Sequence, residues 1–217
     1  MSLTYGSDVD KVSNIMLYAA RIGLKPETTP FVSKVIKAVK SKGVPVSHAL
    51  AEILLCKYLS ERGYSCDVEY TIGALKCDVY ARKGSVDECI EVFFYLLPVN
   101  EIGNWSKYII SAHIKKFVNA IRSQVKILSF AYPVGLVPLI PLQLLGPITK
   151  ERLVRVLASY GLEDVEEFKD VIEVPLIQYV YLFDLSKASV ARISCENVRS
   201  LIMFYRMIGA GVVDEEL

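Results

Sequence analysis

Three acidic residues occupy positions where a carboxylate is costly, which makes them the first candidates for chemistry. Glu52 lies within an apolar helical stretch, Asp78 in the middle of a strand-like run, and Glu91 in the run that follows. A buried carboxylate loses its hydration unless a partner compensates. If the two runs form neighbouring strands, Asp78 and Glu91 face one another and repel, and a bound cation relieves that repulsion. Carboxylate ligands suit Mg²⁺ or Mn²⁺.

The hydrophobic pattern predicts the elements that position these acids. Helices are expected over residues 8–21, 30–42 and 46–62, each followed by a glycine stop. Strands are expected at 66–72, 75–82 and 88–96, then a helix over 105–124 and a strand over 125–132. After a proline-rich connection, Thr149 is expected to cap a helix that ends at Gly161, before a strand at 176–185 and a helix at 194–207.

The predicted elements over residues 46–132 place Glu52 in a helix, Asp78 and Glu91 in two successive strands, and a further helix and strand after them. This arrangement resembles that of the PD-(D/E)XK nuclease superfamily. The resemblance implies an α/β fold with a mixed central sheet flanked by helices, as in restriction endonucleases and Holliday-junction resolvases. We expect an N-terminal helical extension (1–45), a nuclease-like core (46–135) and a C-terminal strand–helix addition (136–217) on the same domain. The resemblance further implies that Asp78 and Glu91 bind the catalytic metal and that Glu52 assists in catalysis.

The sequence departs from the family pattern at the lysine that follows the second acid by two positions. Phe93 stands there, and it can neither bind a phosphate nor polarise water. Other members of the superfamily carry the lysine on another element, and four lysines of this chain are candidates for that role: Lys76, Lys107, Lys115 and Lys116. Strand alternation places Lys76, Asp78 and Tyr80 on one face, which favours Lys76. The expected catalytic set is therefore Glu52, Asp78, Glu91 and Lys76; alternatively, Lys76 merely pairs with Asp78 or Glu91.

Two local groups of basic residues could contact phosphates, although the formal net charge is only +1. Lys34 and Lys37 lie on one predicted helix, and Lys107, His113, Lys115 and Lys116 lie on another. We take both groups as candidates for nucleic-acid binding. The alternative for the lysines is an ordinary solvated helix face, and the alternative for His113 is a structural role.

The cysteines and the apolar stretches bear on compartment and partners. The chain has 5 cysteines and no CxxC pair, which favours buried reduced thiols and a cytoplasmic location. The stretch from Val134 to Ile148 is interrupted by prolines and glycine, so it is not expected to span a membrane. It is expected to form either a buried connection or the interface of a homodimer.

These observations favour a divalent-metal-dependent nuclease that hydrolyses phosphodiester bonds in DNA, with RNA left open as a substrate. The expected cofactor is Mg²⁺ or Mn²⁺. The alternative is a catalytically inactive nuclease-like domain that binds DNA or protein, for which Phe93 is the best support. The sequence contains no glycine-rich phosphate loop, GxSxG or HExxH motif, which argues against nucleotide-dependent, serine-hydrolase and zinc-protease chemistry.

Overall fold

The computed structural model describes residues 8–94, 105–136, 138–161 and 176–207. These residues form a six-stranded sheet with the strand order β1-β2-β3-β4-β5-β6. The strands are β1 (Ser65–Ile72), β2 (Leu75–Lys83), β3 (Val86–Val92), β4 (Ile127–Pro133), β5 (Leu176–Asp184) and β6 (Ser189–Ser194). The β3/β4 and β4/β5 pairs are parallel and the other pairs are antiparallel. The expected mixed sheet is confirmed.

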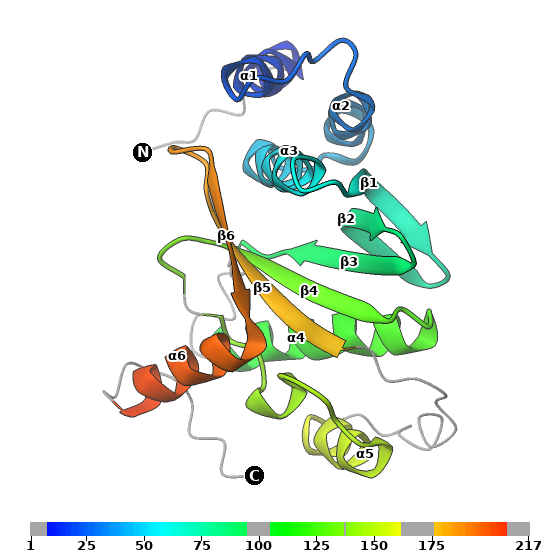
Figure 1. The fold of residues 1–217 in the computed structure, drawn as a ribbon, viewed down its shortest axis with the longest axis vertical. Helices are drawn as coiled ribbons and strands as arrows, with labels where there is room; N and C mark the ends of the chain where they lie inside the picture. Colours follow the sequence, from blue (N-terminus) through cyan, green and yellow to red (C-terminus); the bar gives the residue numbers. More distant parts are fainter. Residues whose placement is uncertain (1–7, 95–104, 137, 162–175, 208–217) are drawn as a thin grey trace.

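Helices cover both faces of the sheet (Figure 1). On one face lie α1 (Asp8–Arg21), α2 (Pro30–Lys42) and α3 (Val46–Ser60), and on the other lie α4 (Trp105–Arg122) and α5 (Lys150–Ser159), with α6 (Cys195–Met207) beside β5 and β6. The order helix, three strands, helix, strand agrees with the sequence prediction. The expected cap is also present, because the Thr149 hydroxyl accepts a hydrogen bond from the backbone N–H of Arg152 at 3.3 Å.

The sheet separates two hydrophobic cores. α3 is buried over most of its surface because it lies between α1 and α2 on one side and the sheet on the other. Such a helix is apolar on nearly all sides and has little amphipathic character. On the opposite face, α4 packs its apolar residues against β2 and the neighbouring strands. A side chain at the boundary between α3 and the sheet is therefore removed from water.

The apolar stretch 134–148 contributes mainly to the core of this chain. Leu139, Ile140, Leu144 and Leu145 are buried in the core on the α4 side, and a short 3-10 helix (Leu142–Leu144) lies within the stretch. The prediction of a buried connection is confirmed for these four residues, whereas Val134 at the start of the stretch is exposed. In the described part of the chain, no helix is long and apolar enough to cross a bilayer.

Two features of the elements differ from the sequence prediction. The edge strand β6 was not expected; its residues are mostly exposed or half-buried, so they show no strict alternation of apolar and polar side chains. The third strand was predicted to continue to residue 96, but β3 ends at Val92, and residues 95–96 lie outside the described ranges.

The cysteines also differ from the prediction. Cys77 and Cys89 form a disulfide between β2 and β3, so the expectation of five reduced thiols is wrong for this pair. Sequence spacing did not indicate it, because the contact depends on how the two strands lie beside each other. The remaining cysteines are free: Cys56 is buried, and Cys66 and Cys195 are half-buried.

Candidate active site

Asp78 lies at an irregular point of the sheet. Between β1 and β2, Val68 pairs with Val79 and Tyr70 pairs with Cys77, so Asp78 and Glu69 between them are left out of the ladder. Between β2 and β3, pairing begins only at Val79, after Asp78. Glu69 has a positive φ of 51°. An irregularity of this kind redirects a side chain at the edge of a functional site. The Asp78 carboxylate thereby turns to β3, where Oδ2 accepts a hydrogen bond from Val92 N at 2.8 Å.

The irregularity also changes which residues share a face of β2. Cys77 and Tyr80 both pack into the core on the α4 side, whereas Val79 packs into the core on the α3 side. Regular alternation would place Cys77 with Val79 and Tyr80 with Lys76. The predicted assignment of faces is therefore wrong beyond Cys77, because the strand does not keep its period of two through Asp78.

Glu91 faces a lysine from the neighbouring helix. The Glu91 side chain is 1% exposed, and Lys116 Nζ of α4 lies 2.5 Å from its Oε2 atom. Burial and the nearby Asp78 charge raise the pKa of Glu91 to about 8, against the opposing effect of Lys116. Burial would lower the pKa of Lys116, but Glu91 and Asp78 outweigh it and raise that pKa above its ordinary value. Lys116 is therefore a charged amine held beside both acids.

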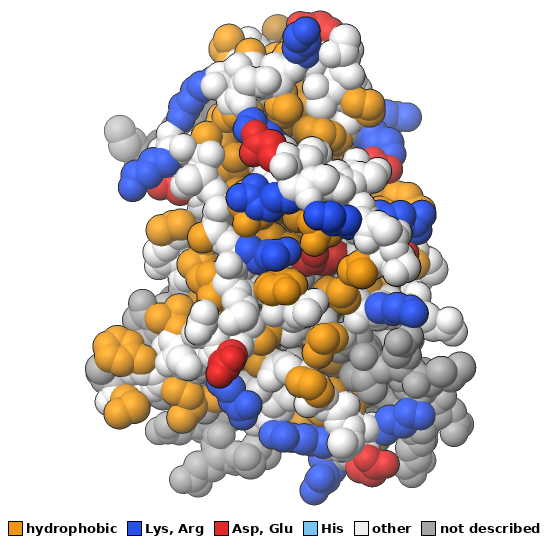
Figure 2. Space-filling view, viewed as in Figure 1, with side chains coloured by type: hydrophobic (Ala, Val, Ile, Leu, Met, Phe, Trp, Pro, Cys, Tyr) orange, Lys and Arg blue, Asp and Glu red, His pale blue; other side chains and the backbone are white. Residues whose placement is uncertain are grey.

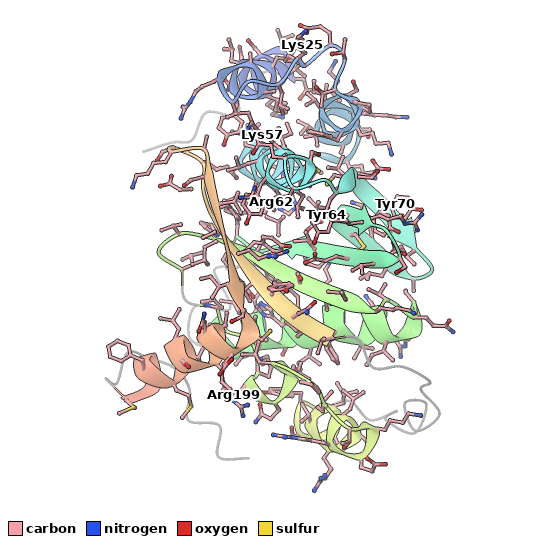
Figure 3. All side chains as sticks on the ribbon, viewed as in Figure 1. Lys25, Lys57, Arg62, Tyr64, Tyr70 and Arg199 are labelled. Atoms are coloured by element: carbon pink, nitrogen blue, oxygen red, sulfur yellow. A yellow bond between two sulfur atoms is a disulfide. The ribbon has the colours of Figure 1, made fainter. Side chains whose placement is uncertain are left out.

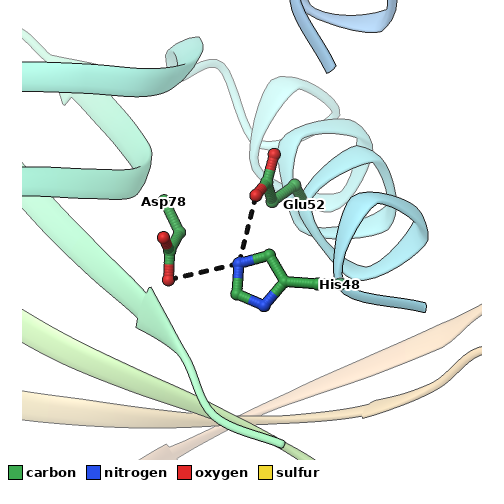
Figure 4. Close-up of side chains that lie close together, drawn as sticks. All are labelled: His48, Glu52 and Asp78. Atoms are coloured by element: carbon green, nitrogen blue, oxygen red, sulfur yellow. Dashed lines mark ion pairs between the residues drawn. The ribbon is translucent and has the colours of Figure 1, made fainter. Parts of the chain in front are cut away.

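Glu52 and His48 approach Asp78 from α3 (Figure 4). The two residues are one helical turn apart and point the same way. His48 Nε2 lies 3.2 Å from Glu52 Oε1 and 3.5 Å from Asp78 Oδ2, so the imidazole bridges the helix and the strand. Sequence reasoning gave His48 no role. Its i, i+4 spacing from a carboxylate on an apolar helix was the available signal.

The cluster perturbs the pKa of each member. Burial would lower the pKa of His48, but its contacts with Asp78 and Glu52 outweigh burial and raise it to about 10. Burial raises the pKa of Glu52 to about 7 in spite of His48. Burial would also raise the pKa of Asp78, but His48, Lys116 and the Val92 N–H hold it below its ordinary value. Perturbed pKa values of this kind are common at functional sites.

The donor atoms fit a divalent cation. One ligand atom each from His48, Glu52 and Asp78 lie within 4.8 Å of one another. Oε2 of the fully buried Glu52 has no hydrogen-bond partner among the described residues, whereas Glu52 Oε1 lies beside His48 and Glu91 Oε2 beside Lys116. Buried carboxylate oxygens without a directed donor are costly. Hard oxygen donors with one imidazole are an acceptable set for Mg²⁺ or Mn²⁺.

Phe93 belongs to the core on the α4 side. Its ring stacks on His113 with 4.2 Å between centroids and meets Phe130 edge-on at 5.6 Å. His113 is fully buried, with Nδ1 2.7 Å from the Ile109 carbonyl and Nε2 2.5 Å from the Tyr132 hydroxyl. The proposed contact of His113 with nucleic acid is thus wrong, because the ring lies inside the protein.

None of the remaining predicted residues whose side chains the structure describes forms an ion pair with Glu52, Asp78 or Glu91. Lys76, the preferred substitute for the motif lysine, forms an ion pair with Glu69, a partner that neither the catalytic assignment nor its alternative, pairing with Asp78 or Glu91, had named. Lys34 pairs with Asp67, while Lys37 and Lys115 have exposed side chains. The side chain of Lys107 lies outside the described part of the structure. Of the predicted candidates, the structure brings together Glu52, Asp78, Glu91 and Lys116.

Comparisons with known proteins add a distant structural likeness. No protein-family model and no curated protein sequence matches the chain. The crystal structure of an XisH family protein from Nostoc punctiforme is similar to it, with 10% sequence identity and a TM-score of 0.33. That alignment covers 65% of this chain and 96% of the XisH family protein.

Proposed function

We propose that this chain is a divalent-metal-dependent nuclease that hydrolyses phosphodiester bonds in DNA. The observation that carries the proposal is the ion pair between Lys116 and Glu91 beside Asp78. It supplies an amine next to the two acids although Phe93 occupies the lysine position of the motif. The resemblance of the element order to PD-(D/E)XK nucleases supports the same function.

In this proposal, Asp78 and Glu91 hold Mg²⁺ or Mn²⁺, and Glu52 and His48 complete the site on the α3 side. The bound metal supplies a water of lowered pKa and neutralises charge on the scissile phosphate. Lys116 donates hydrogen bonds to the attacking water or to a phosphate oxygen. It can do so because its ammonium group stays protonated and the packing of α4 fixes its position.

His48 has a positioning role in this proposal. Its imidazole holds the carboxylates of Glu52 and Asp78 on one side of the site. Two acids on separate elements would repel one another without such a group between them. Because its contacts with Asp78 and Glu52 raise its pKa to about 10, His48 is protonated near neutral pH and acts in this proposal as a cation between the two acids.

The proposal is tested by cleavage of labelled nucleic acids. A panel of single strands, duplexes, flaps and four-way junctions, in DNA and in RNA, is incubated with Mg²⁺, Mn²⁺ or EDTA. We expect cleavage of DNA that requires metal and is lost in Asp78→Asn. Asp67→Asn is the matched control, because Asp67 is a β1 carboxylate that pairs with Lys34 outside the cluster.

A second candidate function is a catalytically inactive binding module. The packing of Phe93 against His113 favours it, since the motif position serves the core. Absence of cleavage on every substrate, together with absence of Mn²⁺ binding by calorimetry, would reject the nuclease and support this module. RNA cleavage without DNA cleavage would keep the metal chemistry and correct the substrate.

A further inference from the structure

Three basic side chains meet at the C-terminal end of α3, away from the acid cluster. Arg62 follows α3, Lys83 ends β2 and Arg192 lies in β6. Figure 3 labels Arg62 and Tyr64 between α3 and the sheet, and Figure 2 shows lysine and arginine side chains gathering across the middle of the same face. We call this group, together with the rings of Tyr58, Tyr64 and Tyr179, the tyrosine–cation surface.

Each of the three cations lies over a tyrosine ring. The Arg62 guanidinium is 3.5 Å from the Tyr58 centroid and the Arg192 guanidinium 4.2 Å from the Tyr179 centroid. The Lys83 ammonium is 5.3 Å from the centroid of Tyr64. A cation over an aromatic face is attracted to the ring quadrupole. These contacts reduce the number of positions that the long basic side chains adopt, so their charges are already in place for a ligand.

Further contacts join the three cations into one group. The Lys83 ammonium donates a hydrogen bond to the Arg62 carbonyl at 2.8 Å. Arg192 donates to the Tyr64 hydroxyl at 3.5 Å, so the same tyrosine contacts Lys83 through its ring and Arg192 through its oxygen. The charges of Lys83 and Arg192 therefore lie at Tyr64, and Lys83 also contacts the backbone of Arg62, whose guanidinium lies over Tyr58.

The surface carries positive charge that the described residues leave unbalanced. No described carboxylate forms an ion pair with Arg62, Lys83 or Arg192, and all three side chains are exposed. Neighbouring cations differ, because Arg82 pairs with Asp87 and Lys57 pairs with Glu61. Gathered like charges repel one another, and an external anion relieves the repulsion.

A buried acid, Glu88, lies beneath the surface and attracts Arg192 without forming an ion pair with it. Glu88 is 3% exposed, and its Oε1 atom accepts hydrogen bonds from Ser129 at 2.5 Å and from Tyr181 at 3.0 Å. Burial raises the pKa of Glu88 in spite of these donors and of Arg192. Glu88 is thus satisfied within the sheet, below the three exposed cations.

We infer that the tyrosine–cation surface binds the phosphate backbone of the nucleic acid on which the acid cluster acts. Arginine forks and lysine ammonium groups suit phosphate oxygens, and the exposed groups of this surface are cationic rather than apolar. The identity of the polyanion rests on the proposed function. From Glu52 to Ser60, α3 rises about 12 Å, which is about four base-pair steps of 3.4 Å along one strand. The proposed contacts therefore extend from the acid cluster along α3 towards its C-terminal end.

The test is the salt dependence of DNA binding in EDTA, where the proposed cleavage does not occur. Fluorescence anisotropy of a labelled duplex is measured from about 50 to about 200 mM salt. The triple variant R62Q/K83Q/R192Q is compared with K11Q/K57Q/R82Q, which removes three paired cations and changes the net charge equally. The slope of log affinity against log salt falls by about 0.9 for each phosphate that the protein no longer neutralises. We therefore expect the slope of R62Q/K83Q/R192Q to fall by two to three times that amount. The slope of the control variant should fall by far less.

The single variant K83Q guards against misfolding of the triple variant, because Lys83 is an exposed residue at the end of β2. We expect one increment of slope, about 0.9, with an unchanged thermal melting curve. Equal loss of affinity in both triple variants would overturn the inference, since net charge alone would then explain it. Binding to anionic vesicles or to poly-glutamate but not to DNA would also overturn it.

Failure of the inference is distinguishable from failure of the proposed function. Metal-dependent cleavage that is lost in Asp78→Asn, with DNA binding unaffected by R62Q/K83Q/R192Q, would keep the nuclease and reject this surface. DNA binding that depends on the three cations, without cleavage of any substrate, would keep the surface and favour the binding module.

Discussion

Lys116 Nζ of α4 lies 2.5 Å from Glu91 Oε2 of β3, although no lysine follows Glu91 along its own strand. The contact crosses from one element to another, and the ring of Phe93 lies within the core on the same side. The geometry shows that a helix can deliver an amine to a buried acid when the adjacent strand position is taken up by packing.

We expect Lys116→Met to reduce metal-dependent cleavage by about 100-fold or more, because it removes the amine beside Glu91 and Asp78. Lys76→Met is the matched control, since Lys76 pairs with Glu69 instead. Rates are measured under single-turnover conditions on the best substrate of the panel, with thermal melting to confirm folding. Equal activity of Lys116→Met and wild type would show that this amine has no part in the chemistry.

Metal binding is expected to depend on the acid cluster irrespective of activity. Asp78→Asn should weaken Mn²⁺ binding by at least roughly tenfold, the lower range seen when even an outer partner of a metal ligand is removed. Calorimetric titration with Mn²⁺ measures this directly. Asp67→Asn should bind Mn²⁺ as tightly as the wild type does. A similar weakening of Mn²⁺ binding in both variants would show that Asp78 is not a ligand of the metal.

Stability should fall in mild acid because His113 is buried without charge. Burial lowers the pKa of His113 to about 4 from an ordinary value of 6.5. Between these values the unfolded chain binds a proton that the folded chain does not, so the free energy of unfolding decreases as the pH falls from about 6.5 to about 4. The slope for one group is at most about 1.4 kcal/mol per pH unit.

Urea unfolding at several pH values measures this effect against His113→Gln, which does not titrate. As the pH falls from about 6.5 to about 4, the free energy of unfolding should fall more steeply for the wild type than for the variant. Below about pH 4, the two free energies of unfolding should change in parallel. The neighbours of the ring are the Ile109 carbonyl, the Tyr132 hydroxyl and two phenylalanine rings, none of which titrates there. Parallel curves throughout would contradict a buried neutral His113.

The disulfide between Cys77 and Cys89 is expected to appear in a thiol count. Three of the five cysteines should react with a thiol reagent in denaturant without reductant, and all five after reduction. Replacing both cysteines by serine should lower the free energy of unfolding by about 2–4 kcal/mol, measured by urea unfolding. Five reactive thiols before reduction would contradict the cross-link.

The hydrophobic pattern was sufficient to predict the order of the main elements because most of them bury an apolar face, β1 being an exception with Val68 as its one buried residue. It failed at β6, whose side chains are largely exposed. It also failed at Asp78, where the backbone leaves regular pairing and the assignment of strand faces reverses. Neither effect depends on side-chain hydrophobicity, so neither is visible in its pattern.

The acids of the candidate site could be identified from sequence, but their partners could not. Glu52, Asp78 and Glu91 were identifiable because each is a charge within an apolar run. Choosing among the lysines required knowing which element packs over the acids. Strand alternation pointed to Lys76, whereas Lys116 forms the ion pair with Glu91 and Lys76 pairs with Glu69. His48 was missed because its one signal, the i, i+4 spacing from Glu52 on an apolar helix, was not considered.

The separation of Phe93 from Lys116 has a consequence for how such chains diverge. A residue that both fills a core and delivers an amine is constrained twice, whereas here each duty falls on a different element. Phe93 can exchange with other ring or aliphatic side chains as the core drifts, and Lys116 can be retained through such drift because α4 fixes it independently. A sequence motif that requires lysine two positions after the acid would not detect sequences of this kind. A motif that instead allows the lysine to lie on the next helix would detect them.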